Sequence, residues 1–335
     1  MPRFSYERVY SLIIGKAPQQ EIDTSEVLEE SNTSITVQDD FNTVAESATV
    51  EAIEFTDLHI VADIRSNNKT GGSRTNPAII KIYNLTSASR EFISSVNNYV
   101  VLKAGYRLNS GTEGLPVLFT GQIEEVFTIK EGNDIVTTLK CKDGYTPNKS
   151  IRFAKSFPEG TQYTEIFNFL AQLWANNGIS EGSLILDQEG IVAPVPTVPP
   201  SQATADNGWS YSGYLRQAMD DLCKEFYYKW QIVNSKLFVY PKNFPDMVGQ
   251  ATLTEDDIIT IRPRQANTDN TSTNVDVTGV EVKVLCEGRL DTSKQLRIQG
   301  GDYEGTYRIV EVKHNLAFEE EQWTTTVMCE GLKEG

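Results

Sequence analysis

The sequence predicts a mainly β protein with an α+β middle domain, in which two similar antiparallel β-barrel domains flank a helix-plus-hairpin domain. Alternating apolar residues, typical of strands, fill both ends of the chain, whereas helical spacing of apolar residues is confined to the middle. In addition, residues 123–144 resemble residues 309–331, and each stretch has the pattern of strand, loop, strand and closing Gly turn. Such internal similarity indicates a duplicated β unit.

The two copies align position by position, with a loop about two residues longer and a closing turn one residue shorter in the second copy. In the first strand of each copy, the aligned residues are Ile123, Glu125 and Val126 with Ile309, Glu311 and Val312. In the second strand, they are Ile135, Thr137, Leu139 and Cys141 with Trp323, Thr325, Val327 and Cys329. The second-strand sets have period 2, so each lines one face of its strand.

Length and composition are those of a globular protein. A chain of 335 residues can form two or three domains. No stretch reaches the roughly 20 apolar residues of a membrane helix, and no apolar run near Arg3 and Arg8 is long enough for a signal peptide. The cysteines are far apart and predict buried free thiols in a reducing compartment; they are Cys141, Cys223, Cys286 and Cys329.

The net charge of −16 argues against a protein that wraps around nucleic acid, because such binding needs clustered Lys and Arg. The same charge is compatible with a channel through which DNA slides, because like charges repel.

Residues 1–148 are predicted to form the first barrel. Residues 17–52 within it form an acidic loop or arm, since no Lys or Arg occurs from Ala17 to Ile64. This arm is either a solvated excursion or a segment that docks on a neighbouring subunit. The expected strands lie at 8–14, 58–64, 78–82, 100–104 and 117–120, followed by the hairpin, with a short helical turn at 89–94.

Residues 149–250 are predicted to form the α+β middle domain. Helical spacing predicts helices at 164–175 and 212–226, with Ser212 as the N-cap of the second. The apolar stripe of the first helix is formed by Ile166, Phe169, Leu170 and Leu173. Residues 190–208 between them form a Pro-rich, extended loop. A hairpin with its turn at Asn234-Ser235 follows the second helix.

Residues 251–335 are predicted to form the second, smaller barrel. Alternation of Val280, Val282, Val284 and Cys286 predicts one of its strands. Residues 296–298 predict another, followed by a Gly-Gly turn and the second copy of the hairpin.

Residues that could carry chemistry are few and poorly spaced. The histidines His59 and His314 sit in strand patterns without the spacing of zinc ligands, so they are interpreted as ordinary strand residues. The stretch from Gly208 through Ser210 to Ser212 resembles a nucleophile elbow but lacks its final glycine.

Two further groups of residues are candidates for catalysis or for binding a partner. Glu165 could pair with Asp220 or Asp221 as acid and base, but such a pairing is expected by chance in a chain with 46 acidic residues. The aromatic cluster of Tyr227, Tyr228 and Trp230 beside Lys229 is interpreted as sheet packing, with an exposed interface anchor as the alternative. No nucleotide-binding motif is present. The sequence therefore predicts no catalytic, cofactor-binding or metal-binding residue, and no enzyme.

Several phrases, in order, resemble the central baseplate hub protein of contractile-tailed bacteriophages. They cover most of residues 55–331. They are NPAIIKIYNLTSASREFI (76–93), VVLKAGY (100–106), LPVLFTGQIEEVF (115–127), DIVTTLKCKDG (134–144), LRQAMDDLCKEFYYKWQIVNSKLFVYPK (215–242) and GTYRIVEVKHNLAFEEEQWTTTVMCEG (305–331). The acidic stretch at 17–50 is a departure from the family pattern.

The resemblance implies two barrels of the tail-tube type and a homotrimer that forms a pseudo-six-fold ring. In that arrangement the ring joins a tail tube or tube-initiator protein to the tail spike protein, contacts other baseplate proteins, and lets DNA pass without specific binding. It further implies a virion protein assembled in the host bacterial cytoplasm. The alternatives are the hub of a non-contractile tail or a phage-like injection machine, and, less favoured, a cell-wall hydrolase.

Overall fold

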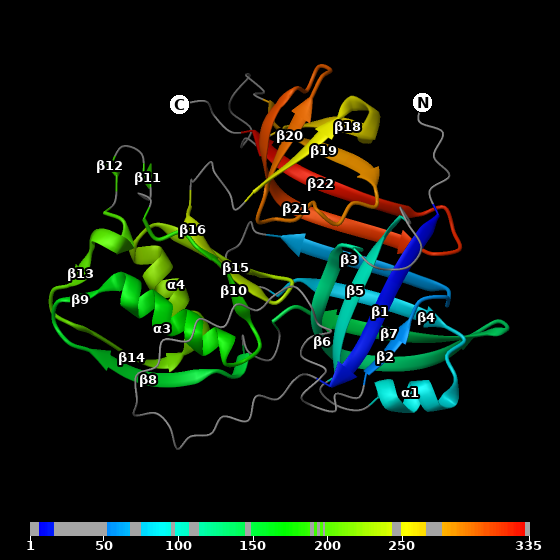
Figure 1. The fold of residues 1–335 in the computed structure, drawn as a ribbon, viewed down its shortest axis with the longest axis horizontal. Coiled ribbons are helices and arrows are strands. Elements are labelled where there is room, and N and C mark those ends of the chain that lie inside the picture. The colour runs from blue at the N-terminus through cyan, green and yellow to red at the C-terminus, as the bar shows by residue number, and fades with distance from the viewer. Residues whose placement is uncertain are drawn as a thin grey trace.

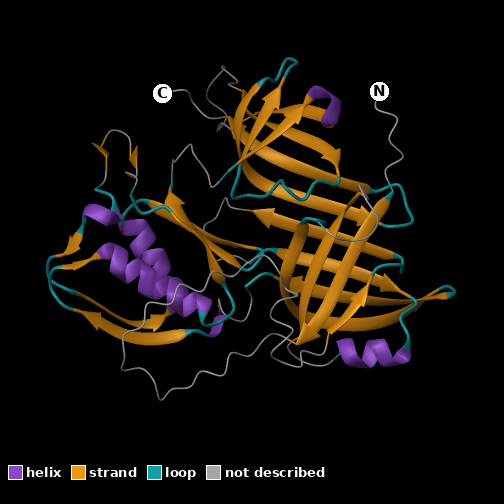
Figure 2. Cartoon of the chain, viewed as in Figure 1, coloured by secondary structure: helices purple, strands orange, loops and turns teal. Residues whose placement is uncertain are grey.

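The computed structural model describes residues 7–16, 52–67, 75–94, 98–106, 114–144, 149–187, 191–192, 195–196, 198–242, 249–265 and 277–331. Within these ranges the protein is mainly β, with antiparallel sheets and three α-helices (Figures 1 and 2), which confirms the predicted fold class. The acidic arm predicted at 17–52 lies outside the described residues except for Ala52.

The first β unit has the strand order β3-β4-β7-β6-β5-β1-β2. Its strands alternate as the sequence predicts: Tyr10, Leu12 and Ile14 are fully buried, and the apolar residues of β3 and β4 face the same core. A short helix, α1 (Ser87–Ile93), is capped by Thr86. The strands are β1 (Arg8–Lys16), β2 (Ala52–Phe55), β3 (Ile60–Asn67), β4 (Pro77–Tyr83), β5 (Asn98–Tyr106), β6 (Val117–Glu131) and β7 (Asp134–Lys142).

The second β unit has the order β18-β19-β22-β21-β20-β17. Val280, Val282, Val284 and Cys286 are buried, as their alternation predicts. The pair β17–β20 is parallel, a departure from the antiparallel pattern. The elements are β17 (Gln250–Thr254), the 3-10 helix η3 (Glu255–Asp257), β18 (Ile258–Gln265), β19 (Val277–Leu285), β20 (Gln295–Gln299), β21 (Gly305–Ala317) and β22 (Trp323–Gly331).

The two β units share one continuous sheet of 13 strands, because β21 of the second unit pairs with β3 of the first. In Figure 1 the orange strand β21 of the second unit lies beside the blue strand β3 of the first. The two barrels expected from the sequence are therefore joined by backbone hydrogen bonds as well as by covalent connection. The division of the chain near residues 148 and 250 remains a prediction.

The α+β region lies to one side of this sheet (Figures 1 and 2). Helices α3 (Tyr163–Ala175) and α4 (Leu215–Glu225) share a core with strand β15. Asn234 and Ser235 have φ of 51° and 58°, as the predicted tight turn requires. The remaining elements are β8 (Arg152–Phe157), β9 (Thr161–Gln162), β10 (Ser180–Leu184), β11 (Ile191–Val192), β12 (Val195–Pro196), η2 (Pro200–Gln202), β13 (Thr204–Ala205), β14 (Trp209–Tyr214), β15 (Tyr228–Val233) and β16 (Lys236–Pro241).

Two local predictions in this region are wrong. Ser212 is not the N-cap of α4, because it lies in strand β14, which pairs with β8, and the cap position belongs to Tyr214. The buried face of α3 is also rotated from the predicted stripe: it includes Phe167 and Trp174, whereas Phe169 and Leu173 are only partly buried. Core packing against α4 and β15, which local spacing does not encode, sets this rotation.

No helix in the described part of the chain has the length and apolar character needed to cross a membrane.

Candidate functional site: the junction of the β units and their outer edges

The duplicated hairpins have the same strand register, including the same irregularity. In the first copy, Ile123 pairs with Cys141, a bulge follows, and Val126 pairs with Leu139. In the second copy, the corresponding pairs are Ile309 with Cys329 and Val312 with Val327, and the bulge falls at the same place. Because register and bulges are set by side-chain facing and not by chance pairing, this agreement supports the duplication inferred from the sequence.

The equivalence extends to the strands beside each hairpin. Ala78, Ile80 and Ile82 of β4 pair with β7 at the positions where Val280, Val282 and Val284 of β19 pair with β22. Strand β3 then lies against β4 as β18 lies against β19. The repeat therefore comprises at least five strands: β3, β4, β7, β6 and β5 correspond to β18, β19, β22, β21 and β20.

Trp323 lies where the two β units meet. Its side chain is buried in the core of the first unit, not the second, and its Nε1 donates a hydrogen bond to Gly105 O at 3.2 Å. Phe318 N donates to Ile60 O at 3.0 Å, and Arg8 donates to backbone carbonyls of the turn that precedes Trp323. The far end of the second hairpin is thus inserted into the first β unit.

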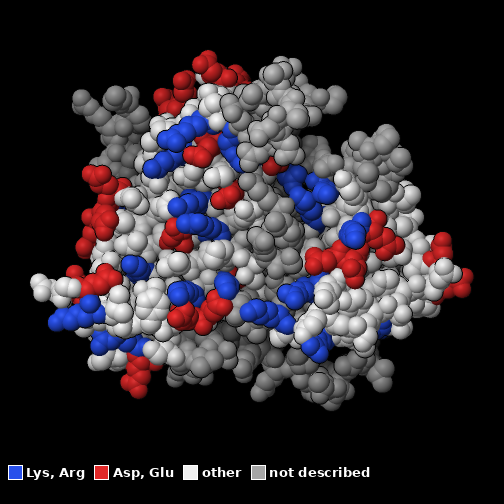
Figure 3. Space-filling view, turned by 180° about the vertical axis from the view of Figure 1, so that it is seen from behind, with Lys and Arg blue, Asp and Glu red and all other residues white. Residues whose placement is uncertain are grey.

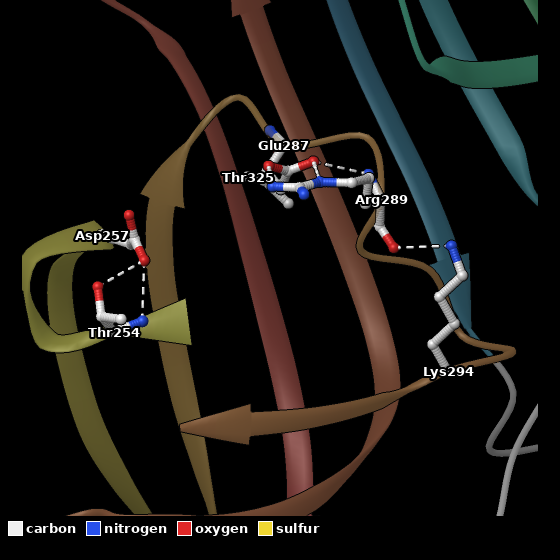
Figure 4. Close-up of polar contacts among 6 residues, drawn as sticks. All are labelled: Thr254, Asp257, Glu287, Arg289, Lys294 and Thr325. Carbon is white, nitrogen blue, oxygen red and sulfur yellow. Dashed lines mark hydrogen bonds and ion pairs between the residues drawn. The ribbon is translucent and has the colours of Figure 1, made fainter. Parts of the chain in front are cut away.

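A polar network around Thr325 also holds this hairpin; Figure 4 shows its members Thr325, Glu287 and Arg289. The Thr325 hydroxyl accepts a hydrogen bond from Glu287 N at 3.0 Å and lies 2.9 Å from Nδ1 of His314, to which it can donate. Burial lowers the pKa of His314 to about 4, so the ring is neutral at pH 7. Burial alone would raise the pKa of Glu287, but hydrogen bonds from Arg289 more than offset this effect and leave it lowered.

The middle region is anchored at the end of the first hairpin. Asp143 Oδ1 accepts hydrogen bonds from Ser235 N at 2.9 Å and Ser235 Oγ at 3.3 Å, so it holds the β15–β16 turn. Burial raises the pKa of Asp143 to about 7. Gly144 has a φ of +61°, and a Cβ there would approach Ile232 Cδ1 to 2.9 Å. The Asp-Gly pair that closes the first hairpin therefore fixes the position of the middle region.

The second β unit contacts the same β15–β16 hairpin. Gln231 Nε2 donates to Thr292 O at 3.2 Å, and the Thr292 hydroxyl donates to Gln231 Oε1 at 3.2 Å. Ser66 at the end of β3 lies 3.1 Å from the same hydroxyl. Three parts of the chain thus meet at this junction through buried and part-buried hydrogen bonds.

The fold does not bring together the residues that the sequence offers as candidates for catalysis or metal binding. His59 faces Glu319 and Glu320 on the outside of the sheet, whereas His314 is buried against Thr325. Ser210 is exposed on strand β14, and among the described residues no hydrogen bond joins it to either histidine. Within the described ranges, no group of three or more His, Cys, Asp or Glu side chains is arranged to hold a metal ion.

Of the candidate acid–base pair, Asp220 has a structural role. Asp220 accepts a hydrogen bond from Trp230 Nε1 at 2.8 Å, and burial raises the pKa of its carboxyl. Glu165 lies on the exposed side of the first turn of α3. Of the aromatic cluster, Tyr228 and Trp230 are buried in the sheet, so the sheet-packing interpretation is confirmed for these two. The four cysteines are buried free thiols, as predicted.

Basic and acidic side chains are interspersed on the face shown in Figure 3. Among the described residues, ion pairs join side chains of neighbouring strands, such as Lys140 with Glu125 at 2.7 Å and Lys313 with Asp63 at 3.6 Å. The described part of this face therefore carries no large field of one sign.

No protein-family model matches the chain, and no curated protein matches it in sequence. Solved structures with a similar fold include the following three. A tail protein from Neisseria meningitidis MC58 is 11% identical, with 83% of this chain and 93% of that chain covered and a TM-score of 0.50. The 43 kDa tail protein of prophage MuSo2 from Shewanella oneidensis is 8% identical, with 83% and 94% covered and a TM-score of 0.50.

The third structure is the E. coli c3393 protein, a component of the type VI secretion system with structural similarity to the T4 bacteriophage tail proteins gp27 and gp5. It is 11% identical, with 82% of this chain and 74% of that chain covered and a TM-score of 0.51. This chain therefore shares its fold with tail proteins and with a secretion-system component.

Proposed function

We propose that this chain is a structural tail protein, the baseplate hub of a contractile phage tail. The observation that carries the proposal is the repeated strand register, which gives one chain two equivalent β units side by side. The fold shared with tail proteins supports it. The chain acts mechanically in the virion tail, after assembly in the host cytoplasm, and no step requires a catalytic residue.

The symmetry of such a chain explains its role. Three copies with two equivalent β units each form a ring of six units. This homotrimer matches a six-fold tail tube, or its initiator protein, on one side and a three-fold spike on the other. DNA passes through the central channel without specific binding once the spike has left.

The middle region extends from one side of the sheet, so in the ring it contacts the spike and other baseplate proteins. Its anchoring through Asp143 and Gly144 ties it to the β units, as a connection that transmits force between tube and spike requires.

Light scattering of the purified chain tests the proposal. We expect the mass of a trimer, or a trimer that forms when the spike protein is added. A monomer under both conditions would count decisively against a hub.

A second assignment is supported by one observation, the similarity to a type VI secretion component. In this alternative the chain is the hub of a phage-like injection machine or of a non-contractile tail. Neighbouring genes distinguish these assignments, because a sheath gene accompanies a contractile tail. A cell-wall hydrolase is less favoured, since Asp220 is bound to Trp230; clearing of peptidoglycan by the purified chain, lost in Glu165→Gln, would favour it.

A further inference from the structure

The contact between the two β units is made by the outer side of β21. After its bulge, this strand pairs with β3 from Glu311 opposite Asn67 to Ala317 opposite Val61. Lys313, which lies opposite Arg65, forms an ion pair at 3.6 Å with Asp63, its diagonal neighbour across this contact. One chain therefore contains a complete example of how one β unit pairs with the next.

The equivalent stretch of the first unit has no such neighbour. Strand β6 pairs with β5 up to Gln122 and, after its bulge, only with β7 among the described strands. Two apolar side chains on this segment are exposed: Phe127 at 37% and Ile129 at 44%. Thr128 and Lys130 of this segment are exposed as well, whereas the equivalent residues of the second hairpin, His314 and Leu316, are buried. The segment 125–131, called here the β6 edge, is equivalent to the part of β21 that pairs with β3, but it has no such second partner among the described strands.

The complementary edge lies at the opposite end of the sheet. Strand β18 is equivalent to β3, but its outer side pairs with no described strand. Ile259 on this strand is 49% exposed. Among the described strands, the outer side of β18 at one end of the sheet and the β6 edge in the first unit therefore have no strand partner. Each is a template for strand addition.

We propose that the β6 edge of one chain pairs with β18 of a second copy of this chain, in the register of β21 with β3. Transfer of the internal register places Ile129 opposite Arg262, Thr128 opposite Pro263, and Phe127 opposite Arg264. This inference rests on the proposed ring and specifies which strands join neighbouring chains in it. The interface is head-to-tail, because each chain offers one edge of each kind, and three such contacts close a ring.

The side chains fit this pairing. Arg264 lies across from the ring of Phe127, where a cation–π contact can form, and Arg262 lies diagonally from Glu131. Pro263 has no N–H, so the pairing lacks one backbone hydrogen bond at that position. Proline on an edge strand is also a device that limits indiscriminate strand pairing, which favours one partner of matching sequence over aggregation.

Disulfide cross-linking of the full chain tests the register. Ile129→Cys combined with Arg262→Cys places two thiols on directly opposed positions of the proposed pair, whose Cβ atoms lie about 4.5–5.5 Å apart, close to disulfide geometry. The native cysteines are buried and do not interfere. On mild oxidation we expect covalent dimers and trimers on a non-reducing gel, and their loss on reduction.

The matched control is Ile129→Cys with Ile261→Cys, because a shift of one residue turns the second thiol to the other face of the sheet. A second pair of variants needs no oxidation: Ile129→Arg faces Arg262 and should lower the trimer fraction at least tenfold. Ile79→Arg, at a side chain 45% exposed on β4, should leave it unchanged.

A trimer by light scattering that gives no cross-link in Ile129→Cys/Arg262→Cys, or cross-links equally in the control pair, would overturn this contact and leave the proposed hub standing. A chain that is monomeric alone and with the spike would overturn both.

Discussion

Trp323 connects the two β units at the scale of a single residue. Its ring is 1% exposed and lies in the core of the first unit, although its strand belongs to the second. The sequence indicates that this side chain is buried, because it shares a face with Val327 and Cys329. It does not indicate which core receives the ring, since that depends on the pairing of β21 with β3.

We expect Trp323→Ala to lower the free energy of unfolding by roughly 3–5 kcal/mol, because it leaves a large cavity and an unpaired Gly105 carbonyl. Ile135→Ala, at the equivalent but only partly buried position of the first copy, should cost about 1–2 kcal/mol. Urea unfolding of both variants measures the difference. An unchanged midpoint for Trp323→Ala would mean that the ring is exposed.

His314 gives the protein a component of stability that depends on pH. Its pKa is about 4 in the folded protein and about 6.5 in the unfolded chain, so only the unfolded chain takes up a proton between these values. This component is fully present above pH 6.5 and is lost as the pH falls toward 4. Asp143 acts in the opposite sense, because its raised pKa favours folding below pH 4 and costs stability as the pH rises to about 7.

We therefore expect the stability difference between the wild type and His314→Gln to shrink by up to roughly 3 kcal/mol as the pH falls from 7 to 4. Comparison with this variant removes the opposing contribution of Asp143, which both proteins share. Chemical denaturation at a series of pH values measures the difference. A difference that is constant across this range would show that the ring is accessible to solvent.

At the scale of elements, the β15–β16 hairpin depends on a residue far away in sequence. Asp143 holds its turn with a buried carboxyl, whereas Asp134 at the β6–β7 turn is exposed. We expect Asp143→Ala to cost about 1–3 kcal/mol and to make the middle region sensitive to proteolysis. Asp143→Asn keeps an acceptor oxygen and should cost less.

Asp134→Ala is the matched control, because a substitution at an exposed turn should change stability by no more than about 0.5 kcal/mol. Limited proteolysis with mapping of the cleavage sites separates the variants. Equal cleavage of the middle region in Asp143→Ala and the wild type would show that other contacts, such as Gln231 with Thr292, suffice to hold the hairpin.

Most β elements can be predicted from the sequence, because a half-buried antiparallel strand shows period 2 in its own residues. The hairpin turn at Asn234-Ser235 and helix α4 are also predictable from local signals: a turn-forming dipeptide and apolar residues at helical spacing. Strand β14 is missed, since its alternation of Trp209 and Tyr211 with serines resembles a helix-capping segment. The parallel pairs β10–β16 and β17–β20 could not be predicted, because their partners are distant in the chain and no local turn connects them.

At the scale of the whole molecule, the duplication is visible in sequence only over one hairpin, yet it extends over at least five strands in the structure. The other strands of the repeat retain buried apolar residues but not the same residues, so sequence comparison loses them while the register preserves them. The joining of the units through β21 and β3 is a property of the assembled sheet. The exposed β6 edge indicates a missing partner only when it is compared with the equivalent segment of β21, which pairs with β3.

Images of the isolated oligomer by electron microscopy, averaged along its symmetry axis, test the proposed ring most directly. We expect six similar lobes around a central hole, with three further lobes from the middle regions at the periphery. Particles with the mass of one chain, or oligomers without a central hole and six-lobed ring, would contradict it.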